Sequence, residues 1–349
     1  MRFIIAGGGT GGHIFPGIAI AQSLTKLSSR HEILFVGTQA GIETREVPKA
    51  GFKLETIQIS GLKGKSFEKT LKAFLELPLS IYHSIQILRK FDPDLVMGVG
   101  GYASGPVLLA AWLLRIPRVI CEQNSVPGFT NRTLGHYFVK TIFGAFQNCA
   151  KYFPPGRFVL TGNPLRVGFS LPPSSEKSGV LILGGSLGAK PINNIVPTAL
   201  ALCQKIKITH QTGKTEVEAV QAAYKKLGLE AEVTAFIEDM PAAYAGAQLV
   251  ISRAGAMTCS ELTAMGVPSI LIPFPQAIDD HQTENAQELV SAGAAILVKQ
   301  SEMTSESLAG RIQILVSDLK NLENMANKAR QIGKSNAADI VAKKVVELC

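Results

Sequence analysis

The chain has 349 residues, more than a single hydrophobic core usually holds, so we expect two domains. Its 46% hydrophobic content and 33 glycines are typical of a globular α/β protein, and no apolar run reaches the ~18 residues that a membrane-spanning helix needs. Five scattered cysteines without a Cys-x-x-Cys pair argue against a zinc site and a disulfide framework. The N-terminus shows no signal-peptide pattern, which predicts a cytoplasmic location.

The net charge of +8 is concentrated in the first half of the chain. Residues 1–164 contain 18 Lys and Arg against 9 Asp and Glu, whereas residues 165–349 contain 17 against 18. A basic half attracts an anionic membrane surface, a phosphorylated substrate or nucleic acid. No nucleic-acid partner is expected, because no such motif is present and only one Trp and six Tyr are available for stacking on bases.

The first half alternates strand patterns with helical or loop segments, which predicts a doubly wound, mostly parallel sheet. The expected strands are residues 2–6, 33–37, 56–60, 94–99, 118–123, 139–143 and 157–161. A glycine loop at 7–12 follows the first strand and precedes a helical pattern over 14–27. This order lets a backbone approach phosphate closely, although the spacing is not that of the dinucleotide fingerprint. His13 lies at the helix mouth, either as a functional residue or as an ordinary exposed histidine.

A second glycine loop, residues 98–106, follows the strand at 94–99 and again opens a helix. Loops at the carboxyl ends of parallel strands meet at one edge of the sheet. We therefore expect the two glycine loops to converge on one binding site.

Residues 60–90 combine a basic rim with an apolar stripe at helical spacing. The basic residues are Lys63, Lys65, Lys69, Lys72, Arg89 and Lys90, and the apolar residues are Phe67, Leu71, Phe74 and Leu75. Such a segment fits a helix resting on anionic lipid. It fits equally a helix whose stripe faces the core and whose basic face is solvated, and the sequence leaves both interpretations open.

The composition of residues 170–175, Ser-Leu-Pro-Pro-Ser-Ser, is that of a linker. A second alternating series follows, with a glycine loop at 184–188 and a helical pattern from about Thr304 to the end. Its expected strands are residues 180–183, 206–210, 231–237, 249–252, 268–273 and 294–298. We therefore expect Rossmann-like domains at 1–164 and 165–334, with a helix at about 335–349 packing back on the first.

The stretch from Ser252 to Asn285 has the pattern of a nucleotide site. Small residues open a helix whose first turn offers backbone N–H groups to an anion. Glu261 comes one or two turns later, where a carboxylate can accept hydrogen bonds from both hydroxyls of a ribose. By composition alone, however, the stretch also fits an ordinary strand–helix unit with a solvated Glu.

Several motifs occur along the chain in a fixed order. They are residues 8–13 with Pro16-Gly17, 100–106, 122–124, 162–166, 184–189, 236–240 and 252–285. In this order they closely resemble the peptidoglycan N-acetylglucosaminyltransferases of glycosyltransferase family 28, and the resemblance spans almost the whole chain. Leu187 is a departure, because many relatives have Gln there.

The resemblance implies a GT-B fold, in which two Rossmann-like domains face a cleft. It implies an inverting hexosyltransferase that moves GlcNAc from UDP-GlcNAc to the C4 hydroxyl of MurNAc in undecaprenyl-diphosphate-linked MurNAc-pentapeptide (lipid I), forming lipid II in peptidoglycan synthesis. The implied partners are UDP-GlcNAc, lipid I and the anionic cytoplasmic face of the cell membrane, which the protein would bind peripherally. No cofactor is implied. Cell-wall synthesis or division proteins are further suggested partners, with roles in cell shape and cell division.

The resemblance also assigns site residues. The donor is expected to bind Thr10, Gly11, Gly12, Asn124, Arg166, Ser186, Ile237, Ala256, Met257, Thr258, Cys259, Ser260, Glu261 and Gln282. The acceptor is expected to bind Gly9, His13, Gly101, Tyr102 and Ser104. His13 is the candidate catalytic base, and donation of a hydrogen bond to the acceptor diphosphate is its alternative role. No metal is expected, because no Asp-x-Asp pair adjoins the diphosphate loops and Arg166 with the helix mouths can neutralise a leaving diphosphate.

Other functions fit the same architecture. A GT-B pair of sheets also serves UDP-GlcNAc 2-epimerases and small-molecule glycosyltransferases, which lack a lipid acceptor. A membrane-docked UDP-sugar-binding subunit without activity is a non-enzymatic alternative. The presence of both glycine loops and the complete nucleotide stretch in one chain argues against that subunit.

Overall fold

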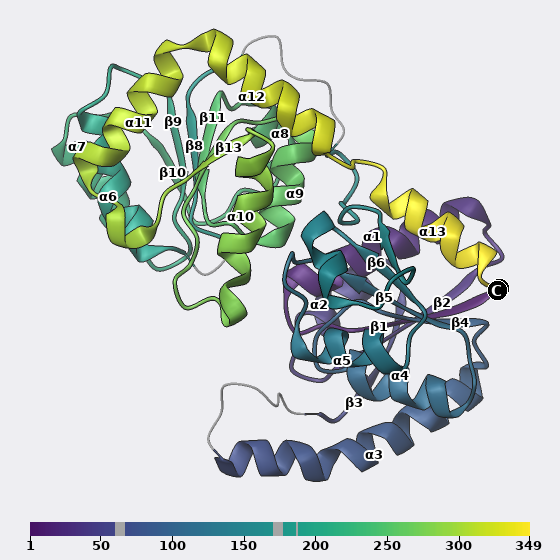
Figure 1. Ribbon diagram of the computed structural model, residues 1–349. Helices are drawn as coiled ribbons and strands as arrows, with labels where there is room; N and C mark the ends of the chain where they lie inside the picture. The colour runs from purple at the N-terminus through teal and green to yellow at the C-terminus, as the bar shows by residue number, and fades with distance from the viewer. Residues whose placement is uncertain (60–66, 170–176, 186–187) are drawn as a thin grey trace. The chain divides into compact units, whose positions relative to one another are not determined.

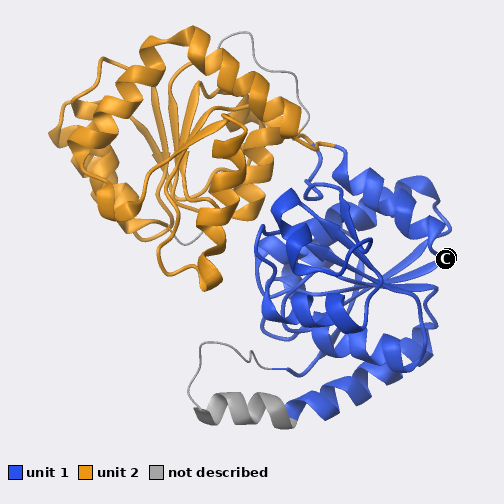
Figure 2. Ribbon diagram, in the orientation of Figure 1, with its two compact units in different colours: residues 1–167, 336–349 blue, residues 168–335 orange. Residues whose placement is uncertain are grey.

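The computed structural model describes residues 1–59, 67–169, 177–185 and 188–349, and only the helical backbone of 67–75 (Figure 1). These residues form two compact units (Figure 2). Unit 1 comprises Met1–Val167 and Asn336–Cys349, and unit 2 comprises Gly168–Ser335. The expected linker at 170–175, Ser186 and the basic residues Lys63 and Lys65 lie outside the described residues, as do the side chains of the apolar stripe.

Unit 1 is built on a seven-stranded sheet in the order β3-β2-β1-β4-β5-β6-β7, with every neighbouring pair parallel. The strands are β1 (Arg2–Ala6), β2 (Glu32–Thr38), β3 (Lys53–Ile57), β4 (Leu95–Gly98), β5 (Arg118–Glu122), β6 (Thr141–Gly144) and β7 (Phe158–Leu160). The strand order reverses between β1 and β4. In such sheets ligands bind at the carboxyl ends of the two strands that flank the reversal.

Helices cover both faces of this sheet (Figure 1). One face packs against α1 (Gly11–Leu27), α2 (Glu43–Lys49) and α13 (Ala337–Glu347), and the other against α3 (Phe67–Phe91), α4 (Ser104–Leu113) and α5 (Phe129–Tyr137). Successive side chains of a strand point to opposite faces, so Phe3 and Ile5 enter the first core while Ile4 and Ala6 enter the second. Because both faces are buried, β1 is a continuous apolar run rather than an alternating one.

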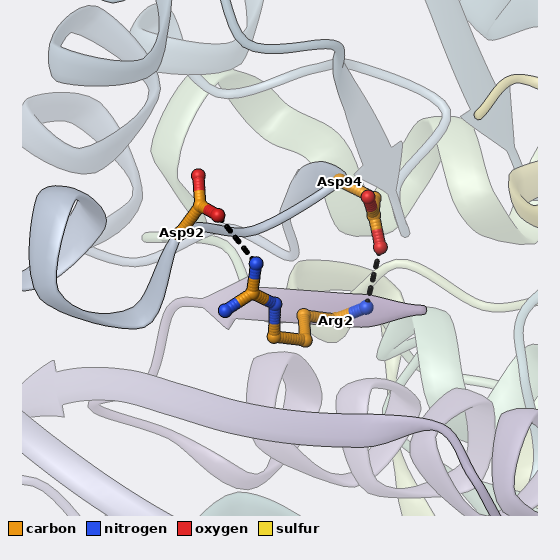
Figure 3. A network of polar contacts seen from close by, with 3 residues as sticks. All are labelled: Arg2, Asp92 and Asp94. Carbon is orange, nitrogen blue, oxygen red and sulfur yellow. Dashed lines mark hydrogen bonds and ion pairs between the residues drawn. The ribbon is translucent and has the colours of Figure 1, made fainter.

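The two ends of the chain lie in unit 1. The last helix, α13, packs on α1, with Val341 and Val345 in the same core as Leu24. At the amino edge of the sheet, the Arg2 backbone N–H donates to Asp94 Oδ2 at 2.7 Å and its guanidinium pairs with Asp92 (Figure 3). The Arg2 and Asp92 side chains are both exposed, so the pair adds little to stability.

Unit 2 repeats the plan with a six-stranded parallel sheet in the order β10-β9-β8-β11-β12-β13. The strands are β8 (Val180–Leu183), β9 (Ile208–Gln211), β10 (Glu232–Thr234), β11 (Leu249–Ser252), β12 (Ser269–Leu271) and β13 (Ala295–Leu297). The helices are α6 (Lys190–Ala201), α7 (Val217–Lys226), α8 (Met240–Gly246), α9 (Ala256–Met265), α10 (His281–Ser291), α11 (Ser305–Ser317) and α12 (Leu319–Ile332). Here the order reverses between β8 and β11, so Gly184 after β8 and the residues between β11 and α9 lie at the carboxyl ends of neighbouring strands.

The doubly wound fold expected from the sequence is confirmed, and the largest corrections to the expected boundaries are at β3, α1 and β10. The third strand was expected at 56–60 but is β3 at 53–57, an edge strand whose half-exposed residues give a weak apolar pattern. Helix α1 begins at Gly11 rather than residue 14, because the Thr10 carbonyl accepts hydrogen bonds from the His13 and Ile14 N–H groups. The strand expected at 231–237 ends at Thr234. Among the described residues, no helix is both long and apolar enough to cross a membrane.

Candidate donor and acceptor sites

The two glycine loops of unit 1 touch, as expected from the sequence. The Gly8 N–H donates to the Gly100 carbonyl at 3.3 Å. Gly101 has a φ of +80°, and a Cβ built on it would lie 2.2 Å from the Gly8 oxygen, so only glycine fits there. The loops therefore meet where the strand order reverses between β1 and β4.

The mouth of α1 presents backbone donors. Thr10 is the exposed N-cap residue with an extended backbone, and Gly11 and Gly12 form the first turn. N–H groups of a first helical turn have no acceptor within the helix, and the helix dipole favours an anion there. Arg166 adds a positive charge beside this turn, because its guanidinium stacks on the Phe15 ring at 4.8 Å from the centroid. This stacking places Arg166 in unit 1, although the second domain was expected to start at residue 165.

A buried carboxylate holds the first glycine loop from beneath. Glu43 is fully buried, and it accepts hydrogen bonds from the Gly9 N–H at 2.7 Å and from the Thr38 N–H and hydroxyl at 2.8 Å each. A Cβ at Gly8 or Gly41 would lie within 2.5 Å of a carboxylate atom of Glu43, so these glycines make room for it. The Gly9 N–H is thus used inside the protein and is not available to the diphosphate of an acceptor substrate.

His13 lies in the first turn of α1 and is half-buried. Its Nδ1 is 3.2 Å from Oε1 of Gln123, the buried residue that follows β5. A Cβ at Gly100 would lie 2.6 Å from the same Nδ1, so the second glycine loop leaves room for the imidazole ring. The ring therefore lies between the segments that follow β4 and β5, in contact with residues far away in the sequence.

Asn124 follows Gln123 at the same edge of the sheet. Its backbone N–H donates to Glu122 Oε1 at 2.9 Å, and Asn131 Nδ2 donates to Glu122 Oε2 at 2.8 Å. Glu122 is 3% exposed, so it acts from within the core to fix the backbone that presents Asn124. This arrangement brings Asn124 to the edge that also carries the glycine loops and Arg166.

The expected acceptor residues differ in what they expose. Tyr102 is 50% exposed, whereas Ser104 is fully buried. A Cβ at Gly98 would lie 2.4 Å from the Ser104 hydroxyl, so this side chain packs α4 against β4. Within unit 1, Tyr102 and His13 are the expected acceptor residues whose side chains are accessible.

In unit 2 the expected diphosphate site is the mouth of α9. Gly255 is its extended N-cap residue and follows β11 directly. Ala256 and Cys259 are buried, while Met257, Thr258 and Ser260 are half-buried. Burial raises the pKa of the Cys259 thiol, which stays protonated in the core. Cys259 therefore has a buried, structural position. Its neighbours Met257, Thr258 and Ser260 are expected donor-binding residues whose side chains are partly accessible.

Glu261 has a partner that the sequence did not indicate. The hydroxyl of Tyr244 in α8 donates to Glu261 Oε2 at 3.1 Å. Tyr244 is fully buried, and its ring packs beside Phe169. The hydrogen bond fixes one oxygen of the half-buried Glu261 carboxylate.

Of the remaining described donor residues, Ile237 lies in a loop and Gln282 in the first turn of α10. Ile237 lies three residues beyond β10. The strand ends before it, where the Thr234 hydroxyl donates to the Phe236 carbonyl at 3.0 Å. Gln282 Oε1 accepts from the Phe274 N–H at 2.9 Å, which ties α10 to the loop after β12. Asn285 Nδ2 of α10 donates to the Ala254 carbonyl at 3.2 Å and so joins α10 to the mouth of α9.

The residues that support the site were missed by sequence reasoning. Glu43, Gln123 and Tyr244 act on residues 34, 110 and 17 positions away, respectively. The only local signal was the cluster of glycines around Glu43, at positions 37 and 41. Gln123 lies inside an expected motif, but nothing in its spacing indicated a contact with His13.

Comparisons with known proteins show the family of the chain. The Glycosyltransferase family 28 N-terminal domain matches residues 3–143, and the family 28 C-terminal domain matches residues 179–343. A Myxococcus xanthus protein named UDP-N-acetylglucosamine–N-acetylmuramyl-(pentapeptide) pyrophosphoryl-undecaprenol N-acetylglucosamine transferase is 48% identical, over 100% of this chain and 93% of its own length.

One solved structure is similar to the chain in both sequence and fold, and another only in fold. The crystal structure of Acinetobacter baumannii MurG has a TM-score of 0.84 and 35% identity, with 99% of each chain covered. A UDP-GlcNAc 2-epimerase from Neisseria meningitidis, solved with UDP-GlcNAc, has a TM-score of 0.71 but only 15% identity, over 99% of this chain and 100% of its own, and shares the fold alone. The chain therefore belongs to the MurG family of family 28 glycosyltransferases.

Proposed function

We propose that the chain transfers GlcNAc from UDP-GlcNAc to the C4 hydroxyl of MurNAc in lipid I and forms lipid II with inversion at the anomeric carbon. The match to the M. xanthus transferase along the whole chain carries the proposal. The donor would bind unit 2, where the mouth of α9 faces the diphosphate and Glu261 binds the ribose. The acceptor diphosphate would bind the paired glycine loops of unit 1.

The reaction is a single displacement. The acceptor oxygen attacks the anomeric carbon from the face opposite UDP, and the bond from that carbon to the diphosphate oxygen breaks with both electrons going to UDP. His13 takes the hydroxyl proton as the new bond forms, and Arg166 with the helix mouths stabilises the leaving diphosphate.

The direct test is incubation of the purified chain with UDP-GlcNAc and a soluble lipid I analogue. We expect mass spectrometry to show a product heavier by one GlcNAc, with release of UDP, only when both substrates are present. Epimerisation of UDP-GlcNAc without the acceptor, and no disaccharide with it, would support the epimerase function instead.

The ribose role of Glu261 is tested by calorimetric titration with UDP. Each hydrogen bond to a charged group contributes ~1.5–3 kcal/mol, so Glu261→Ala should weaken UDP binding by ~10–100-fold. Tyr244→Phe is the matched control, because it keeps the carboxylate and removes only the hydroxyl that orients it. The loss of UDP affinity in Tyr244→Phe should be smaller than in Glu261→Ala. Unchanged UDP affinity in a folded Glu261→Ala variant would show that the ribose lies elsewhere.

We further propose that unit 1 binds the anionic cytoplasmic face of the membrane peripherally. Its net positive charge supports this, as do exposed apolar side chains on α3 and α4, which pack together. They are Leu79, Tyr82, Trp112 and Leu113. Supply of lipid II at this surface would serve cell-wall growth, cell shape and cell division, and proteins of those processes are proposed as partners.

Membrane binding is tested by sedimentation with vesicles of phosphatidylglycerol. Binding should weaken between 0.1 and 1 M salt, as the Debye length falls from ~10 to ~3 Å. Replacing Leu79, Tyr82 and Trp112 by Ser should reduce sedimentation. Leu319→Ser, at a 68% exposed position of unit 2, is the matched control and should not. Equal binding by both variants would place the membrane surface elsewhere.

A further inference from the structure

The side-chain amide of Gln123 has only one orientation compatible with its neighbours. Its Nε2 lies 3.1 Å from the Val99 carbonyl and 3.3 Å from the Cys121 carbonyl. Carbonyl oxygens only accept hydrogen bonds, so the NH₂ group must face them. A flipped amide would place its oxygen against two other oxygens and leave both carbonyls without this donor. Asn163 Nδ2 also donates to the Gln123 carbonyl at 3.1 Å, which fixes the backbone.

This orientation determines which nitrogen of His13 carries a proton. Gln123 Oε1 faces Nδ1 of the ring at 3.2 Å and can only accept. Nδ1 must therefore be protonated, and in the neutral imidazole Nε2 then has the free lone pair. A general base takes a proton on such a lone pair, so Nε2 is the only nitrogen of the neutral ring that can do so.

We infer that Gln123 is a positioning residue, which holds His13 in the Nδ1–H tautomer and leaves Nε2 to accept the proton of the attacking hydroxyl. The catalytic part of this inference rests on the proposed function of His13. The tautomer itself does not, because it follows from hydrogen bonds within unit 1. After transfer both ring nitrogens carry protons, Gln123 still accepts from Nδ1, and Nε2 releases its proton to solvent.

The chain contains its own reference histidines. His31 Nδ1 lies 2.9 Å from the Leu24 carbonyl, so His31 must also be the Nδ1–H tautomer when neutral. His210 Nε2 lies 3.2 Å from Asn193 Oδ1, while Asn193 Nδ2 donates to the Thr212 carbonyl. His210 must therefore be the Nε2–H tautomer. One spectrum thus includes both patterns for comparison.

The experiment is ¹⁵N NMR of the full chain with ring-labelled histidine at about pH 8, where accessible histidines are mostly neutral. His13→Ala identifies the His13 signals by their absence. We expect wild-type His13 to match the Nδ1–H pattern of His31 and to differ from His210. A His13 pattern like that of His210, or an average of both tautomers, would overturn the inference without any variant at position 123.

Two variants test the link to catalysis. Gln123→Leu removes the acceptor and should change the His13 pattern while His31 and His210 stay as in the wild type. With lipid I analogue and UDP-GlcNAc, its kcat should fall ~10–100-fold at an unchanged donor KM. Gln123→Met has a side chain of similar length and likewise lacks an acceptor oxygen, so it should reproduce both the changed pattern and the lowered kcat.

Failures of the inference and of the proposed function are distinguishable. An unchanged His13 pattern in Gln123→Leu would overturn the positioning role, even if kcat fell through misfolding. A changed pattern with an unchanged kcat would overturn the catalytic part. Absence of any turnover by the wild type would refute the transferase function, and the NMR result would remain valid because it needs no substrate.

Discussion

In each unit a side-chain amide oxygen accepts a hydrogen bond from a histidine ring, but the two rings differ in their burial and in which nitrogen carries the proton. In unit 1, His13 is half-buried at a helix mouth, and Gln123 occupies only its Nδ1. In unit 2, His210 in β9 is fully buried, and both ring nitrogens are occupied. Asn193 accepts from Nε2 at 3.2 Å, and the Tyr224 hydroxyl donates to Nδ1 at 3.0 Å.

The same contact with an amide therefore has different consequences at a fully buried histidine and at a half-buried one. Burial lowers the pKa of His210 to about 4, so it stays neutral and serves as a fixed link between β9, α6 and α7. The amide at His13 leaves Nε2 available at the edge of the sheet where the glycine loops meet. We therefore expect changes at His13 to affect turnover and changes at His210 to affect stability.

The largest expected effect is on turnover at His13. A general base contributes ~10²–10⁴-fold, so His13→Ala should lower kcat by that factor with the donor KM nearly unchanged. Because the ring is half-buried, the variant should unfold at nearly the wild-type urea concentration. Steady-state kinetics with UDP-GlcNAc and a lipid I analogue measure the effect. A retained kcat with a raised KM for lipid I would instead make His13 a ligand of the acceptor diphosphate.

The next effect is on the pH dependence of stability at His210. The unfolded chain binds a proton at this residue with a pKa of ~6.5, whereas the folded chain does so at about 4. The free energy of unfolding should therefore fall as the pH drops from ~6.5 to ~4, by up to ~3 kcal/mol from this residue. Urea unfolding at a series of pH values measures the loss.

The control for this measurement removes the His210 imidazole. His210→Gln should flatten the pH dependence relative to the wild type, since the other titrating groups are unchanged. If His210→Gln had the wild-type slope, His210 would not be a buried neutral histidine, and the contrast between the units would fail.

The smallest expected effect is at the hydroxyl of Tyr224. This side chain is buried, and its hydroxyl donates to Nδ1 of His210. Tyr224→Phe leaves that buried acceptor without its donor, which should lower the free energy of unfolding by ~1–3 kcal/mol. The kcat of the folded variant should equal that of the wild type. A lowered kcat at full folding would link the unit 2 network to turnover, contrary to the comparison.

Much of the fold was predictable because its signals are local. The buried strands β1, β8 and β11 are short apolar runs, and their expected bounds are those of the structure. Boundaries moved where the signal was weak, as at the half-exposed edge strand β3, or where backbone hydrogen bonding overrode composition, as at the glycine start of α1. The convergence of the two glycine loops followed from parallel topology and was confirmed.

The sequence by itself determined the alternation of strands and helices, the glycine loops and the family, because each depends on residue types at short, regular spacing. Only the tertiary structure decided which side chains support the site. Glu43 beneath the first glycine loop, Tyr244 against Glu261 and Gln123 against His13 come together because parallel strands bring distant loops to one edge of a sheet. The direction of a side-chain amide, and hence the tautomer of a histidine, depends on the carbonyl groups around it. No spacing along the chain encodes those neighbours.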